Sequence, residues 1–146
     1  MSEKKSAVLS HYLSLITRNR LMRLFTVEEA NAMLPTVREV LGRIRRGFES
    51  IIDAREAAQQ AAERAALGGG GMEGGVRYVR TLTELGESVA RLELMGVQIK
   101  DYERGLVDFP CMRGGRVVFL CWQLGEGESI EWWHEVEAGF AGRQHL

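Results

Sequence analysis

The stretch "MGVQIKDYERGLVDFPC", residues 95–111, decides the fold because the spacing of its apolar residues changes at Gly96. Apolar residues before Gly96 recur every three or four positions, which is typical of a helix that buries one face. After Gly96, "VQIKD" and "LVDFP" flank the turn-forming letters "YERG", in which Gly105 suits a left-handed backbone position. The stretch therefore predicts that a helix ends at Gly96 and that a β-hairpin follows.

The segment that begins "FTVEEA" predicts the first helix upstream of this point. Thr26 can accept a hydrogen bond from the backbone of Glu29, and the Glu29 side chain can return one to Thr26, which is the capping-box pattern. Pro35 has no backbone N–H, so we expect this short helix to end near Met33 and a second helix to begin at Pro35. An alanine-rich continuation favours a second helix that runs to about Ala66.

Two apolar stripes predict that the second and third helices pair. The stripe of the second helix is Val37, Val40, Leu41, Ile44, Phe48, Ile51 and Ile52. The letters "LGGGGMEGG" separate it from a third helix and predict a mobile loop at residues 67–75. The stripe of the third helix is Val76, Val79, Leu82, Leu85, Val89, Leu92 and Met95. Two long helices joined by a short flexible loop most simply form an antiparallel hairpin.

Downstream of the first β-hairpin, glycine-containing turns separate further apolar segments. Gly114-Gly115 joins "LVDFPC" to "RVVFLCWQL", and "GEGE" joins that segment to "SIEWWH". This order of elements predicts an α+β fold, a long antiparallel helical hairpin followed by a small three- to four-stranded antiparallel β-meander. We expect a single domain at residues 25–146, helical over 25–96 and sheet with a tail over 97–146. Residues 1–24 form an N-terminal extension that either lies outside the fold, which we favour, or docks on the domain as a short amphipathic arm.

The turn at Gly114-Gly115 sets a strand register that places Asp108 opposite Cys121. The face predicted to meet the helices carries Val107, Phe109, Cys111, Val118, Leu120, Trp122 and Leu124. A three-residue first turn would add Ile99 to this face and place Lys100 opposite Asp108. The turn at "GEGE" can close in more than one way. One such geometry adds Ile130, Trp132 and His134 to the core face and leaves Glu131 and Trp133 on the outer face.

Composition and charge exclude several classes of protein. The chain has 146 residues and a net charge of −1, without basic residues interleaved with aromatics, so we expect neither nucleic acid nor a membrane as a partner. No apolar run is long enough to cross a bilayer, and the N-terminal stretch lacks the pattern of a signal peptide. Two cysteines without a CxxC pair indicate a reducing compartment, so we expect a cytoplasmic protein. The common nucleotide-binding, metalloprotease and hydrolase motifs are absent from the sequence.

The letters "HEVE" near the C-terminus are the strongest signal of a functional site. His134 and Glu137 are three residues apart, so a helical turn here would point both to one side, a spacing used by carboxylate–imidazole metal sites. Glu131 or Asp108 would complete the ligand set from the sheet, and such ligands suit a divalent metal, namely zinc, iron or manganese. The alternative is that His134 caps the strand and hydrogen-bonds a neighbour, with the glutamates solvated.

Asp108 lies between Val107 and Phe109 in a predicted strand, where aspartate is disfavoured. A carboxylate in that position needs a partner or a function. Its partner would be Lys100 across the strand pair, and its function would be that of an acid, a base or a metal ligand. Cys121, its predicted neighbour, has no nearby cation in this register, so we interpret it as a small buried hydrophobic residue.

Two further residues near the C-terminus are candidate ligand-binding residues. Trp132 and Trp133 face opposite sides of a strand, so one of them lies on the outer face, where Trp133 is predicted to bound a pocket for a small ligand. Arg143 would either pair with the acidic run at residues 126–137 and hold the tail across the sheet, which we favour, or supply an anion contact in the same pocket. The sequence thus places any site at the edge of the sheet, after the last strand.

Four blocks of the chain carry a family resemblance, namely "FTVEEANAMLP", "GVQIKDYERGLVDFP", "LCWQLGE" and "WWHEVEAGFAGRQ". Together they resemble an uncharacterised bacterial family, domain-of-unknown-function family 2203, over residues 25–146 and in the order of the family. The resemblance implies a soluble bacterial protein and supports the view that the segment before Met22 is additional. That family has no established activity, so the resemblance implies no mechanism.

The sequence supports two functions from different classes. The first is an interaction or assembly module that forms a homodimer through the helices, because the stripe of the second helix exceeds what a small sheet can cover. The alternative is a metal- or small-ligand-binding protein, with an enzyme as one option, whose site at the edge of the sheet comprises Asp108, Glu131, His134 and Glu137. Neither a substrate nor a reaction is indicated by these residues.

Overall fold

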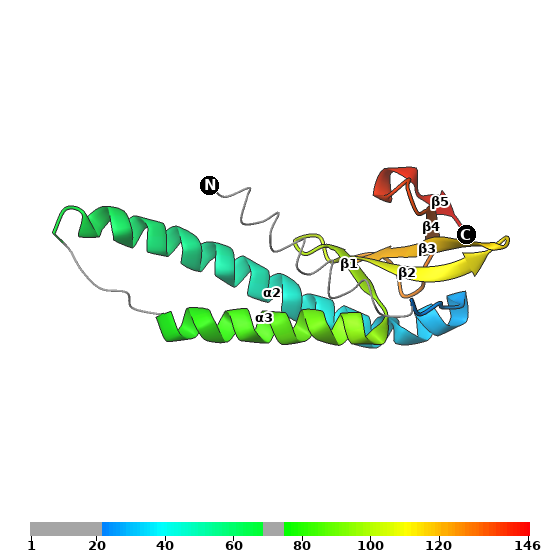
Figure 1. The fold of residues 1–146 in the computed structure, drawn as a ribbon, viewed down its shortest axis with the longest axis horizontal. Coiled ribbons are helices and arrows are strands. Elements are labelled where there is room, and N and C mark those ends of the chain that lie inside the picture. The colour runs from blue at the N-terminus through cyan, green and yellow to red at the C-terminus, as the bar shows by residue number, and fades with distance from the viewer. Residues whose placement is uncertain (1–21, 69–74) are drawn as a thin grey trace.

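The computed structural model describes residues 22–68 and 75–146, and it confirms the predicted α+β class. Helices α2 (Val27–Ala65) and α3 (Gly75–Met95) form an antiparallel pair that precedes an antiparallel sheet (Figure 1). The strands within the described ranges are β1 (Gln98–Asp101), β2 (Leu106–Arg113), β3 (Arg116–Gln123), β4 (Trp132–Glu135) and β5 (Gln144–His145), with the short 3-10 helix η1 (Phe140–Gly142) before β5. Their order in the sheet follows their order in the chain, so the sheet is a meander.

The sheet has five strands in the described part of the chain, whereas the sequence predicted three or four. The additional strand is β5, which pairs with β4 through Trp132 opposite His145 and Trp133 opposite Gln144. The backbone N–H of Leu146 also donates to the carbonyl oxygen of Glu131, at 2.9 Å. The tail therefore turns back and pairs with β4. The irregular sequence "EAGFAGRQHL" did not indicate this pairing.

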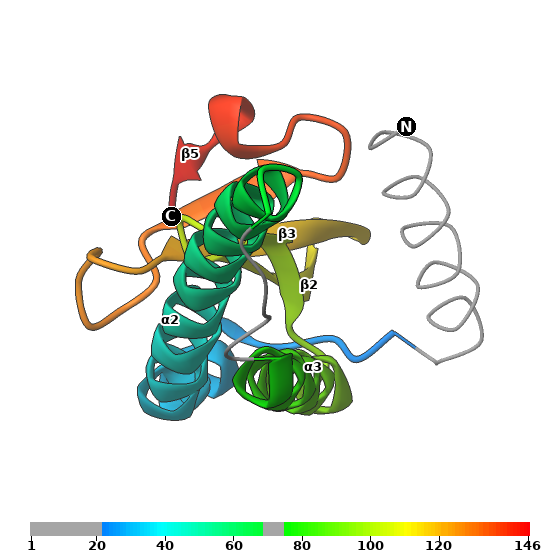
Figure 2. The same cartoon turned by 90° about the vertical axis from the view of Figure 1, so that its left-hand side faces the viewer.

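Helix α3 and the first turns of α2 lie on one side of the sheet, and η1 lies on the other (Figures 1 and 2). The core fills the space between the helices and the sheet. Its buried members from the helices are Ala30, Leu34, Val37, Val40, Leu41, Ile44 and Leu92. Its members from the strands include Val107, Phe109, Val118, Leu120, Trp122 and Trp133. The far ends of both helices extend beyond the sheet (Figure 1), which leaves that part of the hairpin without this cover.

The predicted break in the first helix is wrong, because α2 continues through Pro35. Thr26 caps the helix as predicted, with its side chain accepting from the backbone of Glu29 and the Glu29 carboxylate accepting from the backbone of Thr26. A proline inside a helix costs about 3 kcal/mol or more, but full burial of a leucine or valine side chain contributes roughly 1.5–3 kcal/mol. The buried stripe spans the proline, with Leu34 before it and Val37 after it. Burial along one straight face therefore outweighs the local preference for a break.

The predicted β2–β3 register is confirmed, and the glycines at the turn explain it. Gly114 and Gly115 both have positive φ, at 58° and 75°, which is the conformation that a two-residue hairpin turn requires. Asp108 is opposite Cys121, as the closed turn predicts. The first turn differs, because Gln98 is opposite Asp108 and the pairing shifts between Ile99 and Asp101. Lys100 therefore lies in a β-bulge and is not the cross-strand partner of Asp108.

The prediction of which β4 side chains face the core is also wrong. Leu120 is opposite Trp133 and Phe119 is opposite His134, one residue away from the predicted register. Since alternate residues point to opposite faces, this shift places Trp133 on the core face and His134 on the outer face. Ile130 is buried in the core as predicted, at 4% exposure. The two tryptophans do face opposite ways, but it is Trp132 that lies on the outer face.

Two predictions fall wholly or partly outside the described residues. The N-terminal extension lies there apart from residues 22–24, and the glycine-rich loop lies there at residues 69–74. The residues next to the extension contact the domain, since the backbone N–H of Phe25 donates to the carbonyl oxygen of Pro110, at 2.7 Å. No helix in the ranges that the structure covers is both long enough and apolar enough for a membrane crossing.

Candidate metal centre

Three side chains of metal-binding type meet on the outer face of the sheet. Asp108 of β2, Cys121 of β3 and His134 of β4 each offer one ligand atom, and these atoms all lie within 4.8 Å of one another. Asp108 and Cys121 are directly opposite in the β2–β3 pair, and His134 of β4 is opposite Phe119, two residues from Cys121 along β3. All three side chains are buried, at 2%, 0% and 3% exposure. Three adjacent strands thus bring a carboxylate, a thiol and an imidazole together away from solvent.

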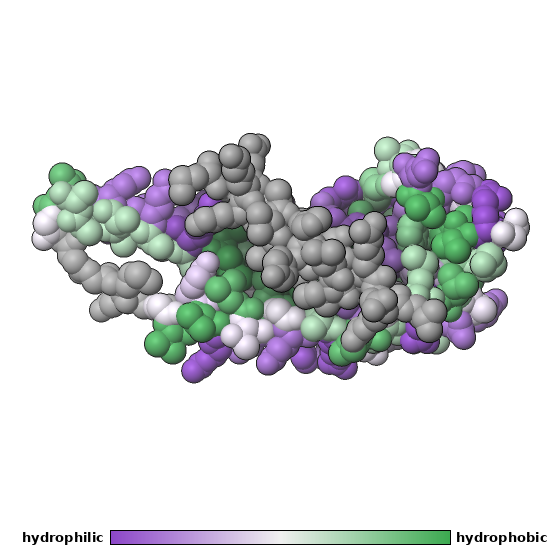
Figure 3. Space-filling view, in the orientation of Figure 1, coloured by the Kyte–Doolittle hydropathy of each residue, from purple (hydrophilic) through white to green (hydrophobic). Residues whose placement is uncertain are grey.

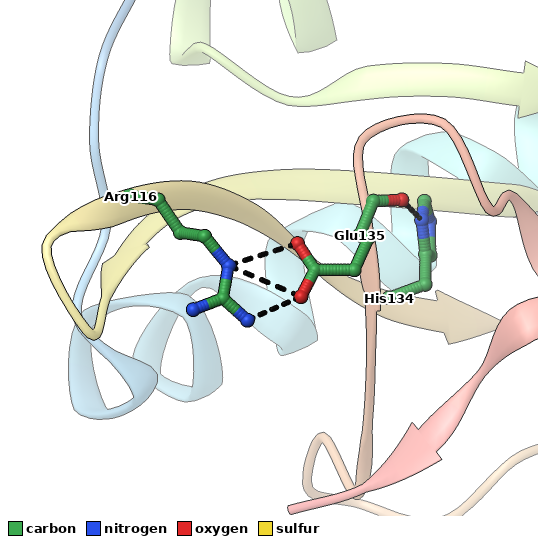
Figure 4. A network of polar contacts seen from close by, with 3 residues as sticks. All are labelled: Arg116, His134 and Glu135. Carbon is green, nitrogen blue, oxygen red and sulfur yellow. Dashed lines mark hydrogen bonds and ion pairs between the residues drawn. The ribbon is translucent and has the colours of Figure 1, made fainter.

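The ring of His134 is held by hydrogen bonds at both nitrogens. Nδ1 lies 2.8 Å from the backbone carbonyl oxygen of Glu135 (Figure 4), and Nε2 lies 3.1 Å and 3.0 Å from the two carboxylate oxygens of Asp108. A carbonyl oxygen only accepts, so Nδ1 must carry a proton. One further proton then lies between Nε2 and the Asp108 carboxylate, because without it both groups would be acceptors. The pair is therefore either an imidazolium with a carboxylate or a neutral imidazole with a carboxylic acid.

An ion pair between neighbouring strands lies beside the backbone that orients His134. The Arg116 guanidinium of β3 donates to both carboxylate oxygens of Glu135, with Nε 3.1 Å from each oxygen and Nη2 also bonded (Figure 4). This bidentate contact lowers the pKa of the Glu135 carboxyl. It lies in solvent, so its contribution to stability is small. The contact matters for the site because the same Glu135 supplies the backbone carbonyl oxygen that accepts a hydrogen bond from His134.

The thiol of Cys121 is kept protonated by its surroundings. Burial, together with the negative charge of Asp108, raises its pKa to about 12, and the nearby Arg143 guanidinium only partly opposes this shift. A thiol with a raised pKa is a poor nucleophile at neutral pH. Since Nε2 of His134 is bonded to Asp108, the imidazole is also not positioned to take the thiol proton. The geometry therefore does not support a cysteine–histidine nucleophile.

A small cavity adjoins the three side chains. Its volume is about 180 Å³, and Asp108, Cys121 and His134 line it. The remaining lining residues are Lys100, Leu106, Phe119, Val136, Gly139 and Phe140. Val136, Gly139 and Phe140 belong to the segment after β4, so the C-terminal tail forms one wall of the cavity. The three candidate ligands are thus buried in the sheet yet adjoin a space that could hold a further ligand.

The tail is held in place by Arg143, as favoured from the sequence. Its Nη2 donates to Glu126 at 2.6 Å, and its guanidinium carbon lies 4.9 Å from the ring centre of Trp132 and 4.6 Å from that of Phe140. The side chain is 11% exposed, so this pair is better shielded than the other ion pairs between full charges. Arg143 therefore holds Phe140 over the outer face and is not among the residues that line the cavity.

The structure brings together only some of the residues that the sequence singled out. Asp108 and His134 are in contact. Glu131 and Glu137 are exposed and lie outside the cluster of potential metal ligands found in the described residues. Trp133 is a core residue at 9% exposure and faces the helices rather than the cavity.

Cys121 was not recognised as a candidate ligand from the sequence, although the signal was present. The predicted register already placed it beside Asp108, an atypical residue for a strand interior. Two chemically competent side chains opposite one another on an outer face indicate a site more strongly than either does alone. Lys100 was considered from the sequence only as the cross-strand partner of Asp108, whereas the structure places it in the wall of the cavity.

One comparison with known proteins gives a match. The family described as "Uncharacterized conserved protein (DUF2203)" matches residues 23–146. This covers most of the chain and includes all three side chains of the cluster. No curated protein and no solved structure matches the chain.

Proposed function

We propose that this protein, which belongs to the family of uncharacterized conserved proteins DUF2203, binds a divalent transition metal through Asp108, Cys121 and His134. The observation that carries the proposal is the convergence of their three ligand atoms within 4.8 Å, on side chains that are buried. Oxygen, sulfur and nitrogen from three residues match the ligand types that zinc takes in proteins. Exposed acidic clusters are common on protein surfaces, whereas a buried carboxylate, thiol and imidazole in contact are not.

The orientation of His134 supports this function. Metal-binding histidines commonly donate one ring N–H to a carbonyl or carboxylate, which fixes the tautomer and directs the other nitrogen at the metal. In His134 the Nδ1 proton is donated to the backbone carbonyl of Glu135, which leaves Nε2 facing Asp108 and Cys121. A metal would replace the proton that Nε2 now shares with the carboxylate.

The donor set favours zinc among the candidate metals. A thiolate is a soft ligand, which suits zinc better than manganese or magnesium, and an imidazole suits zinc and iron alike. Metal coordination deprotonates a cysteine outright, so the raised pKa of the Cys121 thiol lowers the affinity without preventing binding. Three protein ligands with a fourth position open to a cavity is the pattern of catalytic zinc sites. A cytoplasmic location, where thiols stay reduced, fits this use of Cys121.

Elemental analysis of protein purified without a metal-affinity tag tests the proposal. We expect about one zinc per chain at a site of this kind. Cys121→Ala and His134→Ala should each lower zinc affinity by more than about 100-fold, since even residues that only support ligands contribute 10- to 100-fold. Cys111→Ala is the matched control, because Cys111 is also a buried free cysteine but lies on the core face. Substoichiometric metal after incubation with zinc, or metal content unchanged by His134→Ala, would rule the proposal out.

A second function is supported by a different surface. Several apolar side chains at the far end of the helical hairpin are exposed, namely Ile52 at 38%, Val76 at 79%, Val79 at 60% and Leu82 at 42%. Figure 3 shows apolar surface on the first turns of α3, beyond the part of the hairpin that the sheet covers. We propose that a second copy of the chain covers this end, which would make the protein a homodimer through its helices.

Light scattering at micromolar concentration tests the homodimer. Since one chain has a mass of 16.4 kDa, the dimer has twice that mass, or 32.8 kDa. Val79→Glu should shift the population to monomers, because it places a charge in the apolar contact. Arg80→Glu, at the next exposed position, is the control and should leave the mass unchanged. A wild-type mass of 16.4 kDa would exclude the dimer without bearing on the metal.

A further inference from the structure

The cavity beside the three candidate ligands has walls of two kinds. Phe119, Val136 and Phe140 make it apolar, and the ammonium of Lys100 is the one formally positive side chain among its lining residues, apart from His134. A volume of about 180 Å³ corresponds to about six waters at roughly 30 Å³ each. Cavities that take drug-sized ligands span roughly 300–1,000 Å³. The space therefore fits a small organic molecule and excludes a nucleotide or a peptide.

Lys100 reaches this cavity from β1, two residues after Gln98, which is opposite Asp108. The pairing of Ile99 with Val107 is followed directly by that of Asp101 with Leu106, so Lys100 is the extra residue between them. Bulges of this kind redirect a side chain and are frequent next to functional sites. The Nζ atom lies 5.1 Å from the ring centre of Phe119, and it donates to the side-chain oxygen of Gln98 at 3.0 Å.

The ammonium of Lys100 has capacity for a further partner. It carries three N–H donors, and Gln98 takes one of them. Within the described ranges no carboxylate lies at ion-pair distance from it, although four other pairs meet that criterion. A cation without a counterion beside an apolar cavity favours a ligand that has a negative charge at one end and an apolar body.

We infer that the cavity binds a small aromatic or branched aliphatic monocarboxylate, with its carboxylate between Lys100 and the metal. The inference rests on the proposed metal site, which supplies the second contact for the carboxylate. The apolar body of the ligand lies against Phe119, Val136 and Phe140. Arg143 does not supply this contact, because it is not among the residues that line the cavity. Lys100 thereby gives the cavity its preference for a negatively charged ligand. The wall formed by Val136, Gly139 and Phe140 limits the size of that ligand.

Cobalt(II)-loaded protein tests the inference, because cobalt replaces zinc and its visible spectrum reports both the thiolate ligand and the open position. We expect benzoate to change the ligand-field bands of cobalt in a saturable way and benzamide, its neutral analogue, to leave them unchanged. Lys100→Gln should weaken benzoate binding by about tenfold or more, as expected for loss of a hydrogen bond to a charged group. Arg45→Gln, which removes the same charge from an exposed position on α2, should leave benzoate binding unchanged.

The outcomes separate the two proposals. If cobalt produces no thiolate charge-transfer band, the metal site is wrong and the inference falls with it. If cobalt binds but benzoate leaves the spectrum unchanged, or binds Lys100→Gln as tightly as the wild type, the metal site stands and this inference is overturned. Lys100 is also the only lysine after Lys5, so a lysine-directed acylating reagent gives an independent measurement. Benzoate should slow its modification in the cobalt-loaded protein, and an unchanged rate would count against contact with the ammonium.

Discussion

His134 and Asp108 form a buried pair in which one imidazole nitrogen faces both oxygens of one carboxylate, at 3.0 Å and 3.1 Å. The other nitrogen donates to the carbonyl of Glu135, so the proton between the two side chains has no alternative position on the ring. Removing one member of such a pair leaves the other buried without its partner. The consequences differ for the two members, and this difference can be measured.

His134→Leu should lower the free energy of unfolding at neutral pH by about 3 kcal/mol or more, because it leaves the buried Asp108 carboxylate unpaired. Asp108→Asn should cost much less, since the asparagine N–H can donate to Nε2 of a neutral His134 whose Nδ1 keeps its own bond. In the double variant Asp108→Asn with His134→Leu, most of the lost stability should return. Urea denaturation of the four metal-free proteins checks this. Additive losses in the double variant would show that the two side chains are not coupled.

Zinc binding should release at least one proton per chain at pH 7. That proton comes from the thiol of Cys121, whose raised pKa keeps it protonated in the metal-free protein. Calorimetric titrations in buffers of different ionisation enthalpy give the number directly. Cys121→Ala should release about one proton fewer than the wild type, and release of fewer than one proton by the wild type would contradict the assignment of the ligands.

The reactivity of Cys121 in metal-free protein should appear only at high pH. Its thiolate is the reactive form, and a pKa of about 12 against the ordinary value of 9.0 makes that form about 1,000-fold scarcer than in a free cysteine at pH 8. The rate of alkylation should therefore keep rising with pH above 9, where a free cysteine levels off. Iodoacetamide labelling followed by peptide mass spectrometry measures the rate for each cysteine separately. A plateau near pH 9 for Cys121 would show that its surroundings do not suppress ionisation.

The fold class and most of the strand pairing could be predicted because local patterns determine them. The change of apolar spacing at Gly96 and the paired glycines at residues 114–115 act over a few residues, and both are visible in the sequence. The candidate site was predicted in part, since Asp108 and His134 attract attention as polar residues in apolar surroundings. The metal hypothesis grouped the two residues, but the predicted facing put His134 on the core face, away from Asp108, because their direct contact depends on the register of β4.

The register of β4 depends on a contact that no local pattern reveals. The backbone N–H of Ile130 donates to the side-chain oxygen of Asn31 at 2.7 Å, which joins the loop before β4 to the first turns of α2. This contact joins residues 99 positions apart. It anchors Ile130 on α2 just before β4, in the register that places Trp133 in the core. Both tryptophans suit a buried position equally well by composition, so the sequence alone could not distinguish the two registers.

Pro35→Ala should raise the free energy of unfolding by about 1–3 kcal/mol, because Pro35 interrupts the hydrogen bonds of a continuous helix. Pro35 is exposed, so the substitution removes no core contact. Thr36→Ala is the control and should give only a propensity gain of about 0.5 kcal/mol. Urea denaturation compares the two variants. A neutral or destabilising Pro35→Ala would instead favour two separate helices, with the proline at the first position of the second.

Gly105→Ala should destabilise the protein more than Gly125→Ala, although both glycines have positive φ, at 63° and 97°. Both substitutions strain the backbone by about 1 kcal/mol. At Gly105 the new methyl group would also overlap the Leu124 side chain, whose Cγ would be 2.7 Å away, whereas at Gly125 nothing lies within 4 Å.

Overlap of this kind adds about 1–3 kcal/mol, so urea denaturation should separate the two variants by that amount. Gly105 directly precedes β2, and its carbonyl accepts from the backbone of Leu124 at 3.1 Å, so displacement here should also move Asp108 relative to Cys121. We therefore expect Gly105→Ala to weaken zinc binding while Gly125→Ala leaves it unchanged. Equal stability of the two variants would contradict the close approach of Gly105 and Leu124.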